Sequence, residues 1–541
     1  MSQTIYPIGI QNFEKIRKDG YLYIDKTALV YQLVTTGQYY FLSRPRRFGK
    51  SLLLSTLEAY FQGKKELFEG LAMEKLEKDW KEYPILHFDL NISQYDSPDS
   101  LYKILNDILS RYEDEYGTRP SEVTLPLRFA GIIDRAYRKT GQRAVILIDE
   151  YDKPLLQNLH DEETQNRFRN MLKPFYGVLK TMDRAIRFAL LTGVTKFGKV
   201  SVFSDLNNLD DISMREPYAA ICGITETELR THFDEDIHTL ASALERTYEE
   251  ARSLLRKRYD GYHFGNTDIY CPWDVIRYCK SLCADPTAKP QDFWSNSSGN
   301  ALVRSFIDKA DVQTKDEIER LIAGEYIEKE ISQELTYDEI DKSIANLWSV
   351  LFTTGYLTKQ GVTDDGRVRL SIPNREIKNL FIKKIREWFS DTTANDGKTL
   401  EQFCNAFLDK DTEKIEQLFG DYLWNTISIR DTAVAKDKKE NFYHGILLGL
   451  LGYKASWLIK SNTESGTSYS DILVEVPNNR TGIVIELKYA ENGDMDAACD
   501  EALNQIEEKS YVDKLKQDGM RNFIKYGIAC FKKDCKVVVS E

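Results

Sequence analysis

Two groups of residues in this chain of 541 have the types and spacing needed for chemistry on phosphates. The first group is the loop Arg44-Pro45-Arg46-Arg47-Phe48-Gly49-Lys50-Ser51 together with the later carboxylate pair Asp149-Glu150. The second is a pair of short apolar runs that contain Asp471 and Glu486-Leu487-Lys488. Lysine, serine hydroxyl and carboxylate groups are the side chains that bind phosphates and Mg²⁺. The sequence therefore contains two candidate sites, one toward each end.

The loop ending in Lys50 and Ser51 is predicted to bind the phosphates of ATP. It follows the apolar run Tyr39–Ser43 and leads into the amphipathic run Leu52–Phe61, which is the strand, loop and helix order of a P-loop. Gly49 lets the backbone approach the phosphates, and the helix N-terminus offers unpaired N–H groups. We expect Lys50 to reach the β- and γ-phosphates and Ser51 to bind Mg²⁺.

Three arginines give this loop its excess positive charge. Arg44 stands where such loops usually have their first glycine. We expect Arg46 or Arg47 to neutralise charge on the phosphates or in the transition state. The alternative is a basic, solvated surface turn.

The carboxylate pair ends a run, Val145–Ile148, that is typical of a buried strand. In P-loop ATPases of the additional-strand class we expect this strand to lie beside the P-loop strand. Asp149 is predicted to bind Mg²⁺ through water, and Glu150 to activate the attacking water.

Short β-rich runs alternate with longer amphipathic runs from Tyr39 to about Thr195, which predicts a parallel sheet covered by helices. Thr192 follows the last of these runs, where a polar sensor of the γ-phosphate would sit, and Thr195 and Lys196 are the alternatives. The expected strands are Tyr39–Ser43, Ile85–Leu90, Ala144–Ile148 and Arg187–Leu191.

The second group of residues is predicted to form a β-hairpin around Pro477–Thr481. A turn centred on Asn478-Asn479 places Asp471 directly opposite Glu486. Alternation puts the apolar side chains on one face, which we expect to be core: Ile472, Val474, Val476, Ile483, Ile485 and Leu487. The other face carries Asp471, Glu475, Glu486 and Lys488.

Two opposed carboxylates destabilise a sheet unless a cation lies between them. We therefore expect Asp471 and Glu486 to bind Mg²⁺, and Lys488 to orient the attacking water or to stabilise the transition state. Gln505, with Lys509 and Tyr511 on the following helix, is predicted to line the same cleft. The alternative is an exposed charged face without a catalytic role.

Length and composition exclude several classes of protein. A single core stops growing at roughly 250 to 300 residues, so two or three domains are expected. The net charge of −12 argues against a surface that binds nucleic acid everywhere, so any DNA contact is local. We find no apolar signal segment, no stretch long enough to span a membrane, and no CxxC pair among the eight cysteines. We therefore expect a cytoplasmic protein that no membrane anchors, and a homo-oligomer is compatible with this composition.

With both sites in view, the chain resembles the bacterial family that joins an AAA-ATPase-like N-terminal domain to a C-terminal PD-(D/E)XK nuclease domain. The stretches that carry the resemblance follow one another along nearly the whole chain: Tyr6-Pro7-Ile8-Gly9, Tyr23–Thr27, Arg44–Ser51, Leu147–Pro154, Thr192–Phe197, Tyr259–Tyr262, Phe442–Gly445, Asp471-Ile472 and Ile485–Lys488. The resemblance implies that Asp471, Glu486 and Lys488 are the nuclease triad, with Glu440 and Gln505 as accessory residues. One stretch departs from the family pattern. Similar proteins often have Gly-x-Gly-Arg-x-Asp before the metal ligand, whereas this chain has Ser468 and Tyr469 in place of the second glycine and the arginine.

The fold class predicted on this basis is α/β. It combines a P-loop NTPase domain over residues 1–224, a mostly helical middle or lid region over residues 225–395, and a restriction-endonuclease-like α/β domain over residues 399–541. The predicted function is an ATP-binding and ATP-hydrolysing protein coupled to a Mg²⁺-dependent nuclease, with DNA as the expected substrate and RNA as the alternative. The main rival is a nucleotide-switched signalling or scaffold protein whose nuclease-like domain does not cleave. A P-loop kinase-like transferase is disfavoured, because nothing resembles an acceptor site.

Overall fold

The computed structural model describes residues 4–158, 161–195, 208–294, 303, 306–307, 309, 312–332, 343–394, 397–426, 436–454, 456–461, 471–509 and 511–540. The chain divides into two compact units. One consists of Met1–Ser298 with Glu328–Ile377, and the other of Gly299–Ile327 with Lys378–Glu541. Among the described residues, no helix has the length and apolar character needed to cross a membrane.

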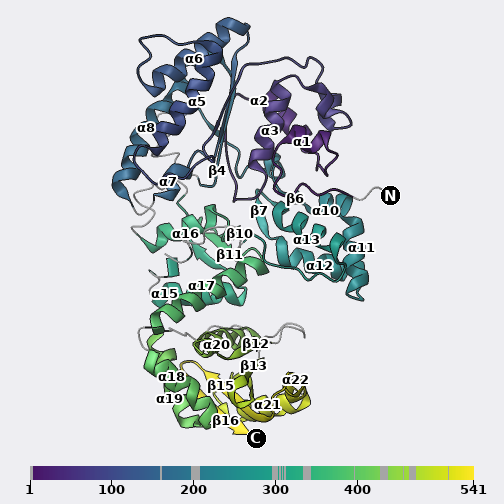
Figure 1. The fold of residues 1–541 in the computed structure, drawn as a ribbon, viewed down its shortest axis with the longest axis vertical. Helices are drawn as coiled ribbons and strands as arrows, with labels where there is room; N and C mark the ends of the chain where they lie inside the picture. The colour runs from purple at the N-terminus through teal and green to yellow at the C-terminus, as the bar shows by residue number, and fades with distance from the viewer. Residues whose placement is uncertain are drawn as a thin grey trace. The chain divides into compact units, whose positions relative to one another are not determined.

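The first unit is built on a parallel five-stranded sheet with the order β2-β3-β4-β1-β5. Helices α5, α6 and α8 cover one face, and α2 and α3 lie on the other (Figure 1). The strands are β1 (Tyr39–Ser43), β2 (Ile85–Asp89), β3 (Ala144–Asp149), β4 (Ile186–Gly193) and β5 (Asp210–Asp211). The helices are α1 (Phe13–Lys18), α2 (Thr27–Thr36), α3 (Lys50–Phe61), α4 (Ala72–Leu76), α5 (Ser100–Tyr116), α6 (Leu125–Thr140), α7 (Lys153–Gln157) and α8 (Glu162–Thr181).

The four strands expected in this part of the chain are confirmed, with ends that differ by at most two residues. They were recognisable because a parallel strand covered on both faces is almost continuously apolar, and all six residues of β3 are buried. The expected neighbours were wrong. β4 lies between β1 and β3 and pairs in parallel with both, so the carboxylate strand does not touch the P-loop strand.

The middle of the chain adds two small antiparallel sheets, β6-β8-β7 and β10-β11-β9, to its helices. The strands are β6 (Ile224–Thr225), β7 (Tyr262–Phe264), β8 (Thr267–Tyr270), β9 (Ile327–Lys329), β10 (Thr358–Val362) and β11 (Val368–Ser371). The helices are α10 (Glu226–His232), α11 (Asp234–Ala243), α12 (Tyr248–Tyr259), α13 (Pro272–Ala284), α15 (Val312–Ala323), α16 (Ile344–Thr353) and α17 (Arg375–Ala394).

The second unit contains a mixed five-stranded sheet with the order β12-β13-β14-β15-β16. Its strands are β12 (Leu458–Ser461), β13 (Asp471–Val476), β14 (Thr481–Tyr489), β15 (Asn522–Phe531) and β16 (Asp534–Ser540). Its helices are α18 (Gly397–Asp409), α19 (Thr412–Thr426), α20 (Lys436–Leu451), α21 (Met495–Glu508) and α22 (Tyr511–Gln517). β14 pairs antiparallel with β13 and parallel with β15.

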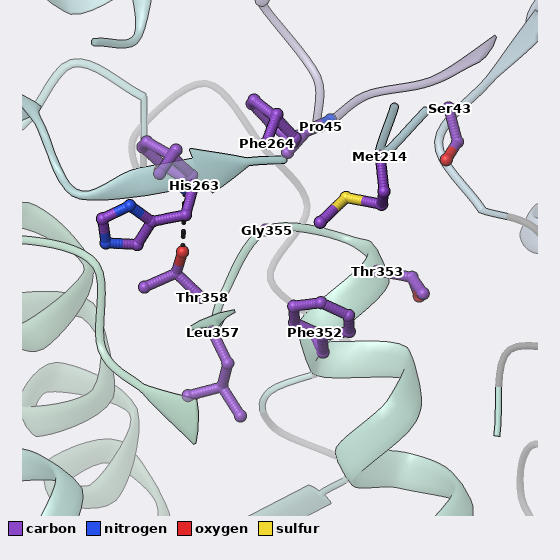
Figure 2. A pocket seen from close by; sticks show the side chains of 11 residues that line it. Ser43, Pro45, Met214, His263, Phe264, Phe352, Thr353, Gly355, Leu357 and Thr358 are labelled. Atoms are coloured by element: carbon purple, nitrogen blue, oxygen red, sulfur yellow. Dashed lines mark hydrogen bonds between the residues drawn. The ribbon is translucent and has the colours of Figure 1, made fainter. Parts of the chain in front are cut away.

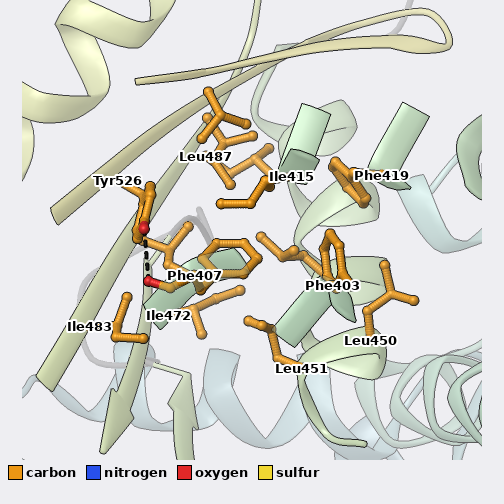
Figure 3. Close-up of a cluster of buried hydrophobic side chains, with 14 of the residues drawn as sticks. Phe403, Phe407, Ile415, Phe419, Leu450, Leu451, Ile472, Ile483, Leu487 and Tyr526 are labelled. Carbon is orange, nitrogen blue, oxygen red and sulfur yellow. Dashed lines mark hydrogen bonds between the residues drawn. The ribbon is translucent and has the colours of Figure 1, made fainter. Parts of the chain in front are cut away.

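One face of this sheet packs on α18, α19 and α20 through the main core of the unit (Figure 3). Phe403 and Phe407 of α18 meet Ile472 and Ile483 of the hairpin there, and the Tyr526 hydroxyl donates a 2.7 Å hydrogen bond to the Phe407 carbonyl. All six hairpin residues assigned to the core face belong to this cluster, which confirms that part of the prediction.

The opposite face of the hairpin is covered as well. Leu473 and Val484 pack there on Ile506 of α21 and Leu515 of α22, and all nine residues of β14 are buried. The alternative of an exposed charged face is therefore wrong, because two helices that follow the hairpin cover it. Glu475, Glu486 and Lys488 on this face are buried, so each of these charges needs a partner.

Candidate phosphate and metal sites

The predicted phosphate loop lies between β1 and α3. Gly49 has a φ of 95° immediately before the first residue of α3. No atom lies within 4 Å of a Cβ built there, so the left-handed backbone and not the space requires glycine. Gly49 is exposed together with Arg46 and Arg47, so the start of α3 is accessible to an anion from solvent.

Lys50 is held in place by the loop itself. Its side chain is buried, and Nζ donates a 3.1 Å hydrogen bond to the Arg44 carbonyl. The same Nζ lies 3.2 Å from Oε1 of Glu150, in an ion pair that is almost completely buried. The predicted phosphate-binding lysine and the predicted general base are therefore in direct contact.

Asp149 gathers the other polar side chains of this site. Ser51 Oγ donates a 2.5 Å hydrogen bond to Asp149 Oδ2, and Thr192 Oγ1 donates a 2.6 Å bond to Oδ1. The strand that intervenes between β1 and β3 thus brings the Thr192 hydroxyl against the carboxylate. Hydroxyl and carboxylate oxygens are the ligands that Mg²⁺ prefers, so Ser51 and Asp149 fit such an ion.

Glu150 adopts a strained backbone at the end of β3. Its φ of 52° is in the left-handed region, which costs a residue with a side chain about 1 to 3 kcal/mol and is found mostly at functional sites. Its N–H donates a 3.0 Å hydrogen bond to Asp149 Oδ1, which helps to hold the turn. The strained turn aims the Glu150 carboxylate at Lys50.

Arg44 explains why the loop lacks its first glycine. The guanidinium is buried and donates hydrogen bonds to the carbonyls of Ser213, Tyr218 and Ala219, and it lies 4.0 Å from the ring centroid of Phe264. Burial lowers the pKa of Arg44 to about 10. This arginine fastens the loop to the residues after β5 and to β7, so it does not belong to the phosphate-facing surface.

Other loop residues pack against the same part of the first unit. Phe48 makes edge contacts with the rings of Tyr262 and Phe264, and a Cβ on Gly355 would come within 2.5 Å of Pro45 Cγ. Between these elements lies a cavity of about 40 Å³ lined by Pro45, Phe264 and Gly355 (Figure 2). It has room for about three water molecules.

The two exposed arginines of the loop differ in their surroundings. Arg47 has a φ of 70° and places its guanidinium 4.2 Å from the Trp273 ring centroid. The Arg46 carbonyl accepts a 2.9 Å hydrogen bond from Trp294 Nε1. Arg46 is the better candidate for a phosphate contact, since the Arg47 side chain is engaged with an aromatic ring.

Asp152 is the residue at this site whose contacts the sequence did not indicate. It is completely buried and accepts hydrogen bonds from Thr195 Oγ1 and from the N–H groups of Val194 and Thr195. The clue in the sequence was a third carboxylate two positions after the Asp149-Glu150 pair. Lys196, one of the alternative sensors, lies outside the described residues.

The hairpin register in the C-terminal unit is as predicted, since Asp471 pairs with Glu486 across β13 and β14. Glu486 has no exposed surface, and its Oε1 lies 3.3 Å from Lys488 Nζ. Lys488 Nζ also donates a short hydrogen bond to Gln505 Oε1 of α21. Glu486 and Lys488 of β14 therefore meet Gln505 of α21 at one point.

One further carboxylate approaches this point, and a second contacts the strand that carries Glu486 and Lys488. Glu501 Oε1, one turn before Gln505, lies 4.0 Å from Lys488 Nζ, a contact that no sequence pattern indicated. Glu440 of α20 is buried and accepts a 3.1 Å hydrogen bond from the N–H of Tyr489, the last residue of β14. Lys509 is exposed, and the stretch Gly466–Ser470 lies outside the described residues.

The donors around Glu486 fit a hard divalent cation. A carboxylate with no exposed surface has lost its hydration, and a bound cation compensates for that loss. Asp471 and Glu486 are the residues that would hold the ion, because the backbone pairing sets them directly opposite each other.

Comparisons with known proteins agree with the two-domain architecture. A family model described as "Predicted AAA-ATPase" matches residues 7–203, and the model of the PD-(D/E)XK nuclease superfamily matches residues 438–540. The chain belongs to the family that joins these two domains. An uncharacterised protein encoded in the vnfD 5′ region of Azotobacter chroococcum mcd 1 is 30% identical over 526 residues, which cover 96% of this chain and 95% of that protein.

Proposed function

We propose that the protein hydrolyses ATP at the P-loop site and cleaves phosphodiester bonds of DNA at the C-terminal site, with nucleotide state controlling cleavage. The proposal places it in the cytoplasm, where the eight free cysteines suit a reducing compartment. The observation that supports the ATPase half is the meeting of Lys50, Ser51, Asp149 and Glu150 in direct contact across two elements. The observation that supports the nuclease half is the Asp471–Glu486 register beside Lys488.

At the P-loop site each side chain has a defined task. Lys50 binds the β- and γ-phosphates once its ammonium turns from Glu150 to the nucleotide, and Glu150 then accepts the proton of the attacking water. Thr192 stays on Asp149, near the position of the γ-phosphate. Mg²⁺ bound by Ser51 and Asp149 supplies neutralisation of the phosphate charge.

At the C-terminal site Glu486 and Asp471 would hold a divalent cation, and such an ion would supply Lewis-acid polarisation of the phosphate and of the attacking water. Lys488 orients that water or neutralises the charge that develops on the phosphate oxygens. Gln505 fixes the direction of the lysine by accepting a hydrogen bond from its ammonium group. The same arrangement suits RNA, so the type of nucleic acid is a question for the assay.

The decisive experiment measures cleavage by the purified full chain on linear, circular and single-stranded DNA and on RNA, with and without ATP, in Mg²⁺ and in Mn²⁺. We expect metal-dependent cleavage of DNA that changes with ATP and is absent in Glu486→Ala. Glu475→Gln is the matched control, because Glu475 is a buried carboxylate on the same hairpin face whose partner is Lys460.

The nuclease proposal fails if the parent binds ATP but cleaves none of these substrates under either metal. That outcome would favour the nucleotide-switched scaffold, in which the C-terminal domain only binds. Cleavage that is equal in the parent and in Glu486→Ala would indicate a contaminating nuclease.

A further inference from the structure

The end of β4 is fixed between two functional segments of the first unit. The Arg44 N–H at the start of the phosphate loop donates a 3.1 Å hydrogen bond to the Gly193 carbonyl. On the other side, the Tyr151 N–H donates a 3.0 Å bond to the Thr192 carbonyl. The stretch that carries the Thr192 hydroxyl therefore links the phosphate loop to the turn that follows the Asp149-Glu150 pair.

Asp152 makes most of the polar contacts on that second side. Its Oδ2 accepts 2.7 Å hydrogen bonds from both the N–H and the hydroxyl of Thr195, and a 3.1 Å bond from the Val194 N–H. A Cβ on Gly193 would come within 2.4 Å of the Tyr151 ring and 2.7 Å of Asp152 Oδ1. The strand end thus lies directly on the side chains of Tyr151 and Asp152 and cannot accept a side chain at Gly193.

A carboxylate is an expensive choice for a purely structural role here. Asp152 is at the N-cap position of α7, where aspartate usually caps the helix, yet its side chain makes no capping bond. Burial, and then the negative charge of Glu150, raise the pKa of Asp152 to about 6. The side chain makes its hydrogen bonds to the two residues that follow β4, and its burial lowers the stability of the protein. A buried carboxylate with a raised pKa is more typical of a functional position than of a structural one.

We infer that Asp152 is a positioning residue for ATP hydrolysis, which holds the end of β4 so that Thr192, Asp149 and Glu150 keep one arrangement around the γ-phosphate. The inference rests on the proposed ATPase function. It separates the roles of two neighbouring carboxylates, since Glu150 contacts Lys50, whereas Asp152 accepts its hydrogen bonds from Val194 and Thr195 after the strand end. Asp152 acts through Thr192 and Thr195 and does not touch the nucleotide.

The test is steady-state ATPase kinetics of the full chain with Asp152→Asn, Thr195→Val and the double variant, together with binding of a non-hydrolysable ATP analogue. Asp152→Asn should lower kcat by on the order of 10- to 100-fold, since small displacements of catalytic groups have effects of that size. Analogue affinity should stay within about threefold, because no binding contact is lost. Thr195→Val should lower kcat less, and the double variant should be no slower than Asp152→Asn.

Asp183→Asn is the matched control. The exposed Asp183 accepts a 2.9 Å hydrogen bond from the hydroxyl of Tyr39, the first residue of β1, at the opposite end of that strand from the phosphate loop. It should lower the melting temperature without lowering kcat. If Asp152 had a purely structural role, Asp152→Asn would behave like this control: it would lose stability, while kcat and analogue affinity, measured well below the melting temperature, would stay at the parent level.

Each of four results would overturn the inference. One is an Asp152→Asn variant that turns over ATP at the parent rate. Another is a combination of two results: Asp152→Asn no longer hydrolyses ATP, but the single variant Thr195→Val hydrolyses it at the parent rate. That combination would make Asp152 itself the general base. If Asp152→Asn does not fold, a parent-like kcat in Thr195→Val decides against the inference. A parent without ATPase activity overturns the proposed function as well, whereas the other results leave that function intact.

Discussion

Replacing Arg44 by alanine should destabilise the first unit far more than replacing Arg47, although the two arginines are three residues apart in one loop. Arg44 is buried and donates to the carbonyls of Ser213, Tyr218 and Ala219, whereas Arg47 is exposed and makes one contact with an aromatic ring. Removing the buried guanidinium leaves those carbonyls without their donor. Arg44→Ala should therefore cost about 3 to 5 kcal/mol, in the range found when one partner of a buried charged interaction is removed.

The melting temperature measures this difference directly. At about 2 °C per kcal/mol for a unit of this size, Arg44→Ala should lower it by roughly 6 to 10 °C. Arg47→Ala loses one cation–π contact of about 0.5 to 1 kcal/mol and should lower it by about 1 to 2 °C. Nucleotide binding by Arg44→Ala, measured well below its melting temperature, should be retained. Equal melting temperatures for the parent and Arg44→Ala would refute the role of Arg44 as the fastener of the loop.

Three other predictions follow from the contacts of single residues. Lys50→Ala should abolish ATP binding in calorimetry and leave the fold intact. If Lys50→Ala bound ATP with the affinity of the parent, the assignment of this loop as a P-loop would be wrong. Mg²⁺ or Mn²⁺ should raise the melting temperature of the parent and of Lys488→Ala but not of Glu486→Ala, because only the carboxylate holds the ion; identical shifts in all three would contradict the metal site. The pKa of Asp152 is raised to about 6 from an unfolded value near 3.9, so its contribution to stability is complete below about pH 4 and is lost as the pH rises through 6. Melting curves of Asp152→Asn across this window should lack that decline, and a decline equal to the parent's would assign it to another group.

Local patterns predicted most of the fold of both sites. β3 was recognisable because it is buried on both faces, and the Asp471–Glu486 register followed from the turn chemistry of Pro477–Thr481. The order of the strands was not predictable in the same way. The apolar run of β4 looks like that of any parallel strand, and only tertiary packing places it between β1 and β3.

The contacts that the sequence did not indicate share a physical cause. Asp152 is held mainly by backbone N–H groups, which every residue except proline has, so no residue type marks its partners. Glu501 approaches Lys488 only because α21 folds over the hairpin face. Arg44 seemed to be a departure from the loop pattern, and its purpose depends on carbonyls about 170 positions further along the chain.

The division of the chain into interleaved units affects how the protein can be taken apart. Residues 299–327 belong with the C-terminal unit and residues 328–377 with the N-terminal one. No single cut of the chain therefore leaves both units complete, so an expression fragment that ends at 298 lacks part of the first unit, and one that begins at 378 lacks part of the second. For the same reason, one recombination event cannot exchange either unit for another. The relative from Azotobacter chroococcum, which is matched over nearly its entire length, is consistent with the two halves being inherited together.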